Sequence, residues 1–204
     1  AMQKDPAEVN LKFCLAFPDV CEVGMSHLGI QILYHVLNGR EEVSCERVFV
    51  PWVDMEGVMR QRDLPLSSLE SSTPLHQFDI LVFSLQYELG FTNVLNMLDL
   101  CRIPFFSEER DERFPLIIAG GPTAFNTEPV ADFFDAIVIG DGEEVVLEIC
   151  DQVMAWKEVR RKKEDLLKSL SQIEGIYIPC RHPKGQKIRK RFVSDLNLSP
   201  FPTC

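Results

Sequence analysis

The sequence predicts an α/β fold built on a doubly wound, mainly parallel sheet of five strands. Short apolar runs alternate with segments of helical periodicity between residues 11 and 156, and the runs LIIA and DAIVI each end in a glycine turn. Continuous apolar runs are typical of strands that are buried on both faces of a parallel sheet. Strands joined by helical crossovers favour the flavodoxin-like order 2-1-3-4-5, with a ligand crevice at the carboxyl ends of the strands.

Each predicted element has its own sequence signal. Runs of Val, Ile, Leu and Phe mark the strands, and apolar residues at helical spacing mark the helices. The five strands are predicted at residues 11–17, 47–51, 78–85, 116–121 and 135–140. Helices are predicted at residues 27–38, 55–62 and 92–101, and from Asp141 through Trp156 into a charged stretch, with a capping box between Asp141 and Glu144. Residues 175–179 are predicted as one more short strand.

Charge divides the chain into an acidic body and a basic tail. Residues 1–156 carry 9 Lys and Arg against 26 Asp and Glu, whereas residues 157–204 carry 12 against 5. We therefore predict an N-terminal tail at 1–10, an α/β domain at 11–156, and at 157–204 a solvated helix end, a short strand and a basic connector. The acidic body argues against a protein that binds phosphate backbones, so no nucleic acid is expected as a partner.

Composition is that of a globular protein. Of the 204 residues, 46% are hydrophobic and 25% are charged, and no apolar run is long enough to span a membrane. The N-terminus lacks the basic region and cleavage site of a signal peptide. The seven cysteines are scattered without a CxxC pair, which favours buried free thiols in a reducing compartment. We expect a cytoplasmic protein without a membrane partner, and the oligomeric state stays open.

Four loops are predicted to converge at the carboxyl edge of the sheet, at residues 19–27, 84–88, 120–125 and 140–143. The candidate cofactor-binding residues in them are His27, Ser84, Gln86, Tyr87, Gly120, Gly121, Pro122, Gly140, Gly142 and Glu143. Glycine lets a flat ligand approach the backbone, and polar groups just beyond a central strand are typical ligand contacts. The structural alternatives are that tight turns need glycine, that Tyr87 covers the core, and that the carboxylates cap a helix.

Motifs that are missing exclude several functions. The loop after the first strand reads VCEVG instead of GxGxxG, which disfavours NAD and FAD, and no GxxxxGK[ST] of a P-loop nucleotidase occurs. No Ser-His-Asp or Cys-His arrangement is present, so no catalytic residue is assigned. His27 has no nearby carboxylate in the sequence to orient it as a ligand, and no metal site is predicted.

Three segments resemble a known family. They are FPDVCEVGMSHLGIQILYHVLN, FDILVFSLQYELGFTNVLNMLDL and LIIAGGPTAFNTEPVADFFDAIVIGDGEE. Together they look like the N-terminal cobalamin-binding-like domain of a family of radical S-adenosylmethionine (radical SAM) proteins, over about residues 11–156. The segments GIYIPC and FVSDLNLSPFPT are similar to the connector that precedes the radical domain in this family.

The resemblance implies that the chain is cut off before a domain whose CxxxCxxC loop holds a 4Fe-4S cluster that cleaves S-adenosylmethionine. That spacing does not occur in this chain. The chain alone is therefore not expected to be catalytic, and the implied partner is the protein's own radical SAM domain.

The resemblance implies cobalamin as the cofactor, although one signature differs. Cobalamin domains of the methionine-synthase type carry DxHxxG, where this chain has Met25 two residues before His27 and Ile30 three residues after it. Ser84 and the pair Gly120-Gly121 match the later serine and glycine motifs in kind and order. This leaves base-off cobalamin without a histidine ligand, with its nucleotide tail along the sheet edge. The alternative, favoured by the missing signature and the polar run from Gln86, is a cofactor-free docking or structural module that positions the radical SAM domain or its substrate.

Overall fold

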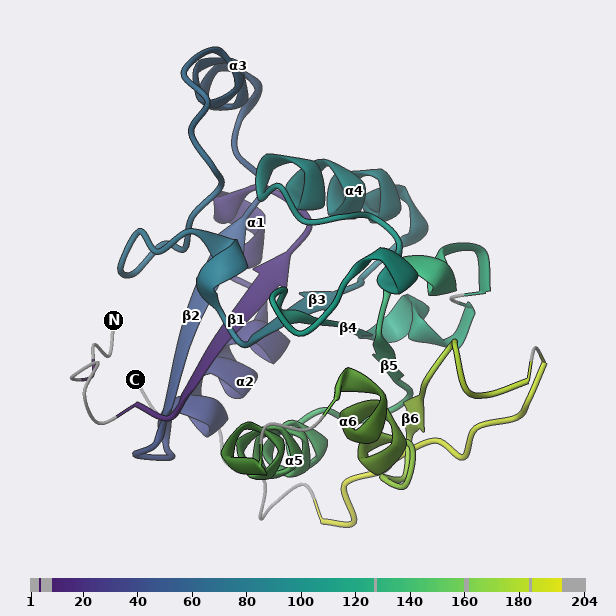
Figure 1. Cartoon of the computed structure of the whole chain (residues 1–204). Helices are drawn as coiled ribbons and strands as arrows, with labels where there is room; N and C mark the ends of the chain where they lie inside the picture. Colours follow the sequence, from purple (N-terminus) through teal and green to yellow (C-terminus); the bar gives the residue numbers. More distant parts are fainter. Residues whose placement is uncertain (1–3, 5–8, 127, 160–161, 184, 196–204) are drawn as a thin grey trace.

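A six-stranded sheet runs through the protein in the order β2-β1-β3-β4-β5-β6 (Figure 1). The computed structural model describes residue 4 and residues 9–126, 128–159, 162–183 and 185–195. The strands from β2 to β5 pair in parallel, and β6 pairs antiparallel with β5. The α/β class and the mainly parallel sheet are confirmed, but the sheet has six strands and not five, because the short strand predicted at residues 175–179 joins it at the edge.

The elements have the following bounds. The strands are β1 Leu11–Phe17, β2 Val43–Phe49, β3 Ile80–Ser84, β4 Leu116–Gly120, β5 Ala136–Val138 and β6 Ile176–Tyr177. The helices are α1 Cys21–Gly24, α2 Leu28–Asn38, α3 Val53–Gln61, α4 Phe91–Leu100, α5 Val145–Val159 and α6 Lys163–Leu170. Strand β2 begins at Val43, earlier than predicted, because polar Ser44 and Glu46 interrupt the apolar run that the prediction required.

Alternating side chains of the sheet build two apolar layers. Phe13 and Leu15 of β1 pack with α2, α5 and α6, whereas Cys14 and Ala16 face the layer that contains α4. Complete burial of one large apolar side chain contributes roughly 1.5–3 kcal/mol. The helices are therefore held to both faces of the sheet, with α5 and α6 on the side opposite α4 (Figure 1).

Residues 163–170 form a separate helix, which corrects the predicted solvated helix end. Leu166, Leu167 and Leu170 of α6 are buried in the same layer as α5. Their spacing places them on one face of a helix. Although α6 lies beyond the boundary predicted at residue 156, it contributes to the core of the α/β domain. Within the described residues, no helix has the length and apolar character that a membrane span requires.

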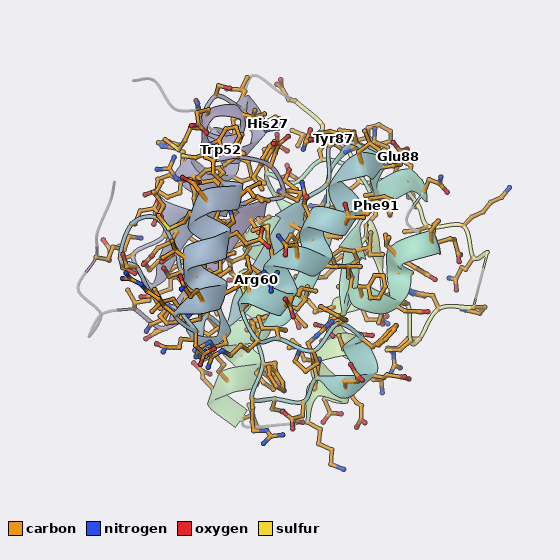
Figure 2. All side chains as sticks on the ribbon, turned by 90° about the horizontal axis from the view of Figure 1, so that it is seen from above. His27, Trp52, Arg60, Tyr87, Glu88 and Phe91 are labelled. Carbon is orange, nitrogen blue, oxygen red and sulfur yellow. The ribbon has the colours of Figure 1, made fainter. Side chains whose placement is uncertain are left out.

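Helix α3 contacts α4 through polar side chains. Arg60 donates hydrogen bonds to Asp99 Oδ2 and Asn96 Oδ1, both at 2.6 Å, and Asn96 donates to Glu56 at 2.9 Å. Figure 2 shows α3 running from Trp52 to Arg60 beside the helix that starts at Phe91. Because few of its own side chains are buried, α3 leaves apolar groups exposed near the carboxyl edge of the sheet.

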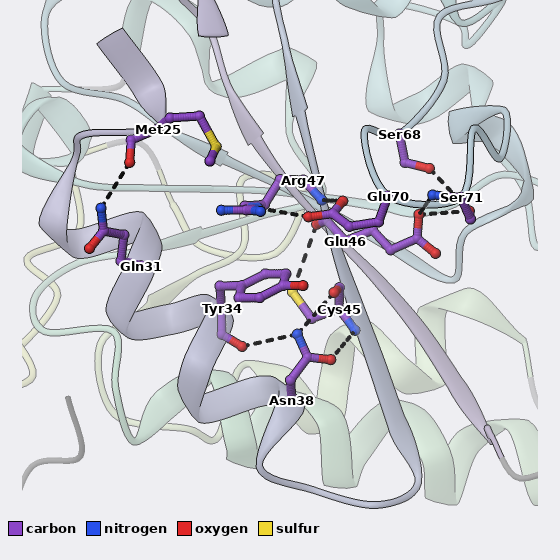
Figure 3. Close-up of polar contacts among 10 residues, drawn as sticks. All are labelled: Met25, Gln31, Tyr34, Asn38, Cys45, Glu46, Arg47, Ser68, Glu70 and Ser71. Carbon is purple, nitrogen blue, oxygen red and sulfur yellow. Dashed lines mark hydrogen bonds and ion pairs between the residues drawn. The ribbon is translucent and has the colours of Figure 1, made fainter. Parts of the chain in front are cut away.

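The outer edge of β2 is covered by groups from both sides of the sheet (Figure 3). The Arg47 N–H and Nε donate to the Glu70 carboxylate at 2.7 Å, and the Leu69 N–H donates to the Arg47 carbonyl at 2.8 Å. On α2, Asn38 bonds both the N–H and the carbonyl of Cys45, at 3.1 and 3.0 Å. An open strand edge can pair with another chain. These contacts therefore oppose addition of a further strand at β2.

Candidate functional site

A pocket of about 290 Å³ lies at the carboxyl edge of the sheet, between α2 and the start of α5. Its apolar walls come from Leu15, Val82 and Val138 of the sheet, from Leu33 of α2 and from Val146 of α5. All of the predicted site residues except Tyr87 line it, namely His27, Ser84, Gln86, Gly120, Gly121, Pro122, Gly140, Gly142 and Glu143. Four loops that are distant in sequence thus surround one volume.

Tyr87 does not line the pocket and does not cover the core. Its hydroxyl donates to the Asp19 carboxylate, and its side chain is partly exposed. This hydrogen bond is the main cause that raises the pKa of Tyr87 above its ordinary value. Tyr87 therefore ties the loop after β3 to the loop after β1.

Gly120 opens the pocket because it has no side chain. It is the last residue of β4 and faces the same layer as Val82 and Val138. A Cβ built on Gly120 would lie 3.7 Å from Val138 Cβ, an ordinary contact, and its φ is outside the left-handed region. Neither packing nor backbone conformation requires glycine at this position. The space left by the missing side chain is part of the pocket.

Gly121 and Gly140 are required by the backbone. Gly121 has a φ of +111°, and a Cβ there would lie 2.6 Å from the Leu85 carbonyl oxygen. Gly140 has a φ of +126°, and its Cβ would lie 2.2 Å from the Arg191 carbonyl oxygen. The structural explanation for a glycine turn therefore accounts for both residues.

We expect Gly121→Ala to lower the free energy of unfolding by more than about 1 kcal/mol, because alanine is strained at positive φ and would clash with Leu85. Gly57→Ala is the matched control, since Gly57 is inside α3 and a Cβ there meets nothing within 4 Å. In a helix this control should stabilise by roughly 0.5–1 kcal/mol. Urea unfolding of both variants measures the difference, and equal effects would contradict the assignment of Gly121.

His27, Gln86 and Ser84 form a directed chain of hydrogen bonds. His27 caps α2, where its Nδ1 accepts the Ile30 N–H at 3.4 Å. The proton is therefore assigned to Nε2, which donates to Gln86 Oε1 at 3.0 Å. Gln86 Nε2 in turn donates to Ser84 Oγ at 2.7 Å. The Ser84 hydroxyl accepts this bond and lines the pocket, so it can still donate its own proton to a ligand.

Both ring nitrogens of His27 are thus engaged, and neither offers a lone pair to a metal. Within the described ranges, no group of three or more His, Cys, Asp and Glu side chains is arranged to hold a metal ion. The sequence has no carboxylate near His27 to orient its ring, and the side-chain amide of Gln86 accepts the ring N–H instead. Residues 27 and 86 are far apart in the chain, and only the meeting of β1 and β3 brings them together.

Glu143 brings a buried acceptor to the pocket. Its Oε2 atom is shielded from solvent and makes no hydrogen bond with the described part of the protein. A buried carboxylate oxygen without a donor costs free energy. A ligand that carries a hydroxyl or amide donor would remove this cost.

The predicted capping box after β5 is wrong. Helix α5 begins at Val145, and the Asp141 carboxylate accepts the Val193 N–H at 2.9 Å. Arg191 Nη2 pairs with Glu144 and Glu148 at 2.9 and 2.6 Å. Arg191 and Val193 of the predicted basic connector therefore lie against the turn after β5. The carboxylates of this turn and of α5 bind the connector and do not cap the helix.

The sequence prediction missed the apolar walls of the pocket. Leu15 and Val82 belong to strands that were correctly located, and Leu33 belongs to the predicted first helix. Strand alternation could have found them, because residues two apart share a face with Ser84 and Gly120.

Comparisons with known proteins identify a family and a distant relative of this chain. Residues 29–179 match the model of a family described as radical SAM proteins, N-terminal. An uncharacterised protein of Methanocaldococcus jannaschii is 19% identical over 191 residues, which cover 92% of this chain and 33% of that protein. The chain thus spans about a third of the length of this curated relative. No solved structure matches this chain.

Proposed function

The chain belongs to the family of N-terminal regions of radical SAM proteins, and we propose that it is a cofactor-binding module that holds the nucleotide tail of a cobalamin. The observation that carries the proposal is Gly120, whose missing side chain opens a pocket without serving the fold. The paired glycines after the fourth strand, with Ser84 after the third, are also the parts of the cobalamin pattern that the sequence matches. The module itself performs no reaction.

The pocket suits a tail better than a whole corrinoid. At about 290 Å³ it is just below the range of roughly 300–1,000 Å³ for small-molecule sites. Apolar walls suit a heteroaromatic base, while Ser84 offers a donor and Glu143 an unpartnered acceptor for sugar hydroxyls. The corrin ring would then lie outside the pocket, at its mouth.

The state of His27 supports a cobalamin without a histidine ligand. Its two ring nitrogens bind Ile30 and Gln86, so the side chain orients the pocket mouth and does not coordinate a metal. A bound cobalamin would supply a cobalt centre able to carry a methyl group. In the whole protein, we propose that a 4Fe-4S cluster and S-adenosylmethionine act in a domain downstream of this module.

Cobinamide, a corrinoid that lacks the nucleotide tail, tests the proposal. We expect the chain to bind hydroxocobalamin at least about tenfold more tightly than cobinamide, a difference of roughly 1.4 kcal/mol. Visible absorbance titrations measure both dissociation constants. Equal affinities would contradict a site that recognises the tail.

A second candidate function is a docking module without a cofactor. The observation in its favour is that His27, Gln86 and Ser84 satisfy one another without a ligand. Such a module would position the radical SAM domain or its substrate. Absence of binding to both corrinoids, in a folded chain, would favour this function.

A further inference from the structure

The connector returns to the pocket and contacts two of the loops that line it. We call residues 189–193 the strap. Lys190 Nζ lies 5.3 Å from the centroid of the Phe125 ring, in the segment after β4. Arg191 forms a parallel bridge with Gly140, in the turn after β5. The strap therefore spans the segments after β4 and β5, both of which contribute to the walls of the pocket.

Hydrogen bonds hold the strap against the turn after β5. The Arg191 N–H donates to the Ile139 carbonyl at 2.9 Å, and the Asp141 N–H donates to the Arg191 carbonyl at 3.1 Å. The Val193 N–H donates to the Asp141 carboxylate at 2.9 Å. The segment between β5 and α5 that these bonds hold forms one wall of the pocket, with the lining residues Val138, Gly140, Gly142, Glu143 and Val146.

Two glycines leave the space that Arg191 occupies. A Cβ on Gly140 would lie 2.2 Å from the Arg191 carbonyl oxygen, and a Cβ on Gly175 would lie 2.8 Å from Arg191 Cβ. Glycine permits so close an approach of two backbone segments because it has no Cβ. The α/β domain is thus shaped to receive the strap at two separate positions.

The strap serves the turn after β5 and not the edge of the strand itself. Strand β6 already pairs with β5, at Ile137 and Val138. The strap bonds the residues that follow, from 139 to 141. Covering an open strand edge therefore does not account for its position.

The Arg191 side chain extends this hold to the start of α5. Its Nη2 atom pairs with Glu144 at 2.9 Å and with Glu148 at 2.6 Å. The Arg191 side chain is 16% exposed, so solvent screens this ion pair less than it screens an open surface pair. Glu144 directly follows Glu143, whose buried carboxylate oxygen has no donor in the described residues. Arg191 therefore fixes the backbone beside the acceptor that Glu143 brings to the pocket.

We propose that Arg191 is a positioning residue for this wall of the pocket, and that seating of the strap and occupancy of the pocket stabilise each other. Such a coupling is reciprocal: if a seated strap strengthens binding by some factor, a bound ligand favours the seated strap by the same factor. The connector therefore responds to whether the pocket is occupied. The inference rests on the proposed function, which supplies the ligand.

Arg191→Ala tests the positioning role. We expect this variant to bind hydroxocobalamin at least about fivefold more weakly, the lower end of typical couplings between sites. Its affinity for cobinamide should be unchanged, because in the proposed function the tail alone enters the pocket. Visible absorbance titrations measure both dissociation constants. An unchanged affinity for hydroxocobalamin would overturn the proposal, and so would an equal loss for both corrinoids, which indicates a general loss of structure.

Arg189→Ala is the matched control within the strap. Arg189 pairs with Glu174 at 2.8 Å, but its side chain is 87% exposed. The substitution removes the same charge and should leave both affinities unchanged. If it weakened hydroxocobalamin binding as much as Arg191→Ala does, net charge and not the position of the wall would explain the loss, and the proposal would be overturned.

Amide hydrogen exchange gives a readout that needs no ligand. In the ligand-free chain, Arg191→Ala should speed exchange over residues 139–146 at least about fivefold, and Arg189→Ala should not. Saturating hydroxocobalamin should slow exchange at residues 189–193 of the unchanged chain. If no corrinoid binds, the proposed function fails, and the ligand-free exchange decides the role of Arg191: faster exchange supports it and unchanged exchange overturns it. Binding that leaves exchange at 189–193 unchanged would overturn the coupling alone.

Discussion

Asp135→Ala is expected to lower the free energy of unfolding by about 3–5 kcal/mol, the usual effect of removing one partner from a buried ion pair. Asp135 is 2% exposed at the start of β5, and its carboxylate lies 2.8 Å from Lys163 Nζ and 3.3 Å from Arg110 Nη2. It also accepts the Ile117 N–H at 2.7 Å. The substitution therefore removes the carboxylate whose ion pairs and hydrogen bond join β4, the segment before it and α6.

The large expected effect comes from the groups that remain. Arg110 is buried, and this burial lowers the pKa of its guanidinium. A buried charge is costly unless it is paired. Its hydrogen bonds to the carbonyls of Pro104 and Phe133 would persist, but it would lose the buried carboxylate that pairs with it. Urea denaturation at neutral pH measures the loss.

Asp151→Ala is the matched control. Asp151 lies on α5 and pairs with Arg40 at 2.5 Å, but its side chain is 56% exposed. Exposed pairs contribute roughly 0–1 kcal/mol, and alanine suits a helix. If both variants lost the same stability, the buried cluster around Asp135 would not hold these elements together.

Gly120→Leu is expected to weaken hydroxocobalamin binding by at least about a hundredfold, since the new side chain would occupy the volume assigned to the tail. The fold should tolerate the change, because a Cβ at Gly120 meets only Val138 at 3.7 Å. Gly120→Ala should have a smaller effect on binding. Absorbance titration gives the affinities, and circular dichroism with urea unfolding establishes that both variants are folded.

Gly57→Leu provides the control for added bulk. A Cβ on Gly57 meets nothing within 4 Å, and α3 is separate from the pocket walls. Its binding should equal that of the unchanged chain. Retained binding in Gly120→Leu would exclude the pocket as the site of the tail.

The fold could be predicted from local patterns where strands are buried on both faces. The run LKFCLAF predicted β1 with the bounds that the structure has, and the run LIIAGG located β4. The start of strand β2 was harder to predict, because this strand alternates polar and apolar residues. Helix α6 was hidden in a basic stretch, where its three buried leucines were outnumbered by charges.

The site was predictable in its location but not in the role of each residue. Parallel strands bring their carboxyl ends to one edge, so the loops after β1, β3, β4 and β5 had to meet there. Whether a glycine serves the fold or the pocket depends on Leu85 and Arg191, which are distant in sequence from Gly121 and Gly140. The packing and the positive φ angles distinguish these two glycines from Gly120.

A hydroxocobalamin titration of the chain, followed by gel filtration, tests the central claim most directly. The proposed function predicts a saturable change in the visible spectrum, and a corrinoid that stays with the protein after gel filtration. An unchanged spectrum, together with a folded protein that elutes free of corrinoid, would contradict it.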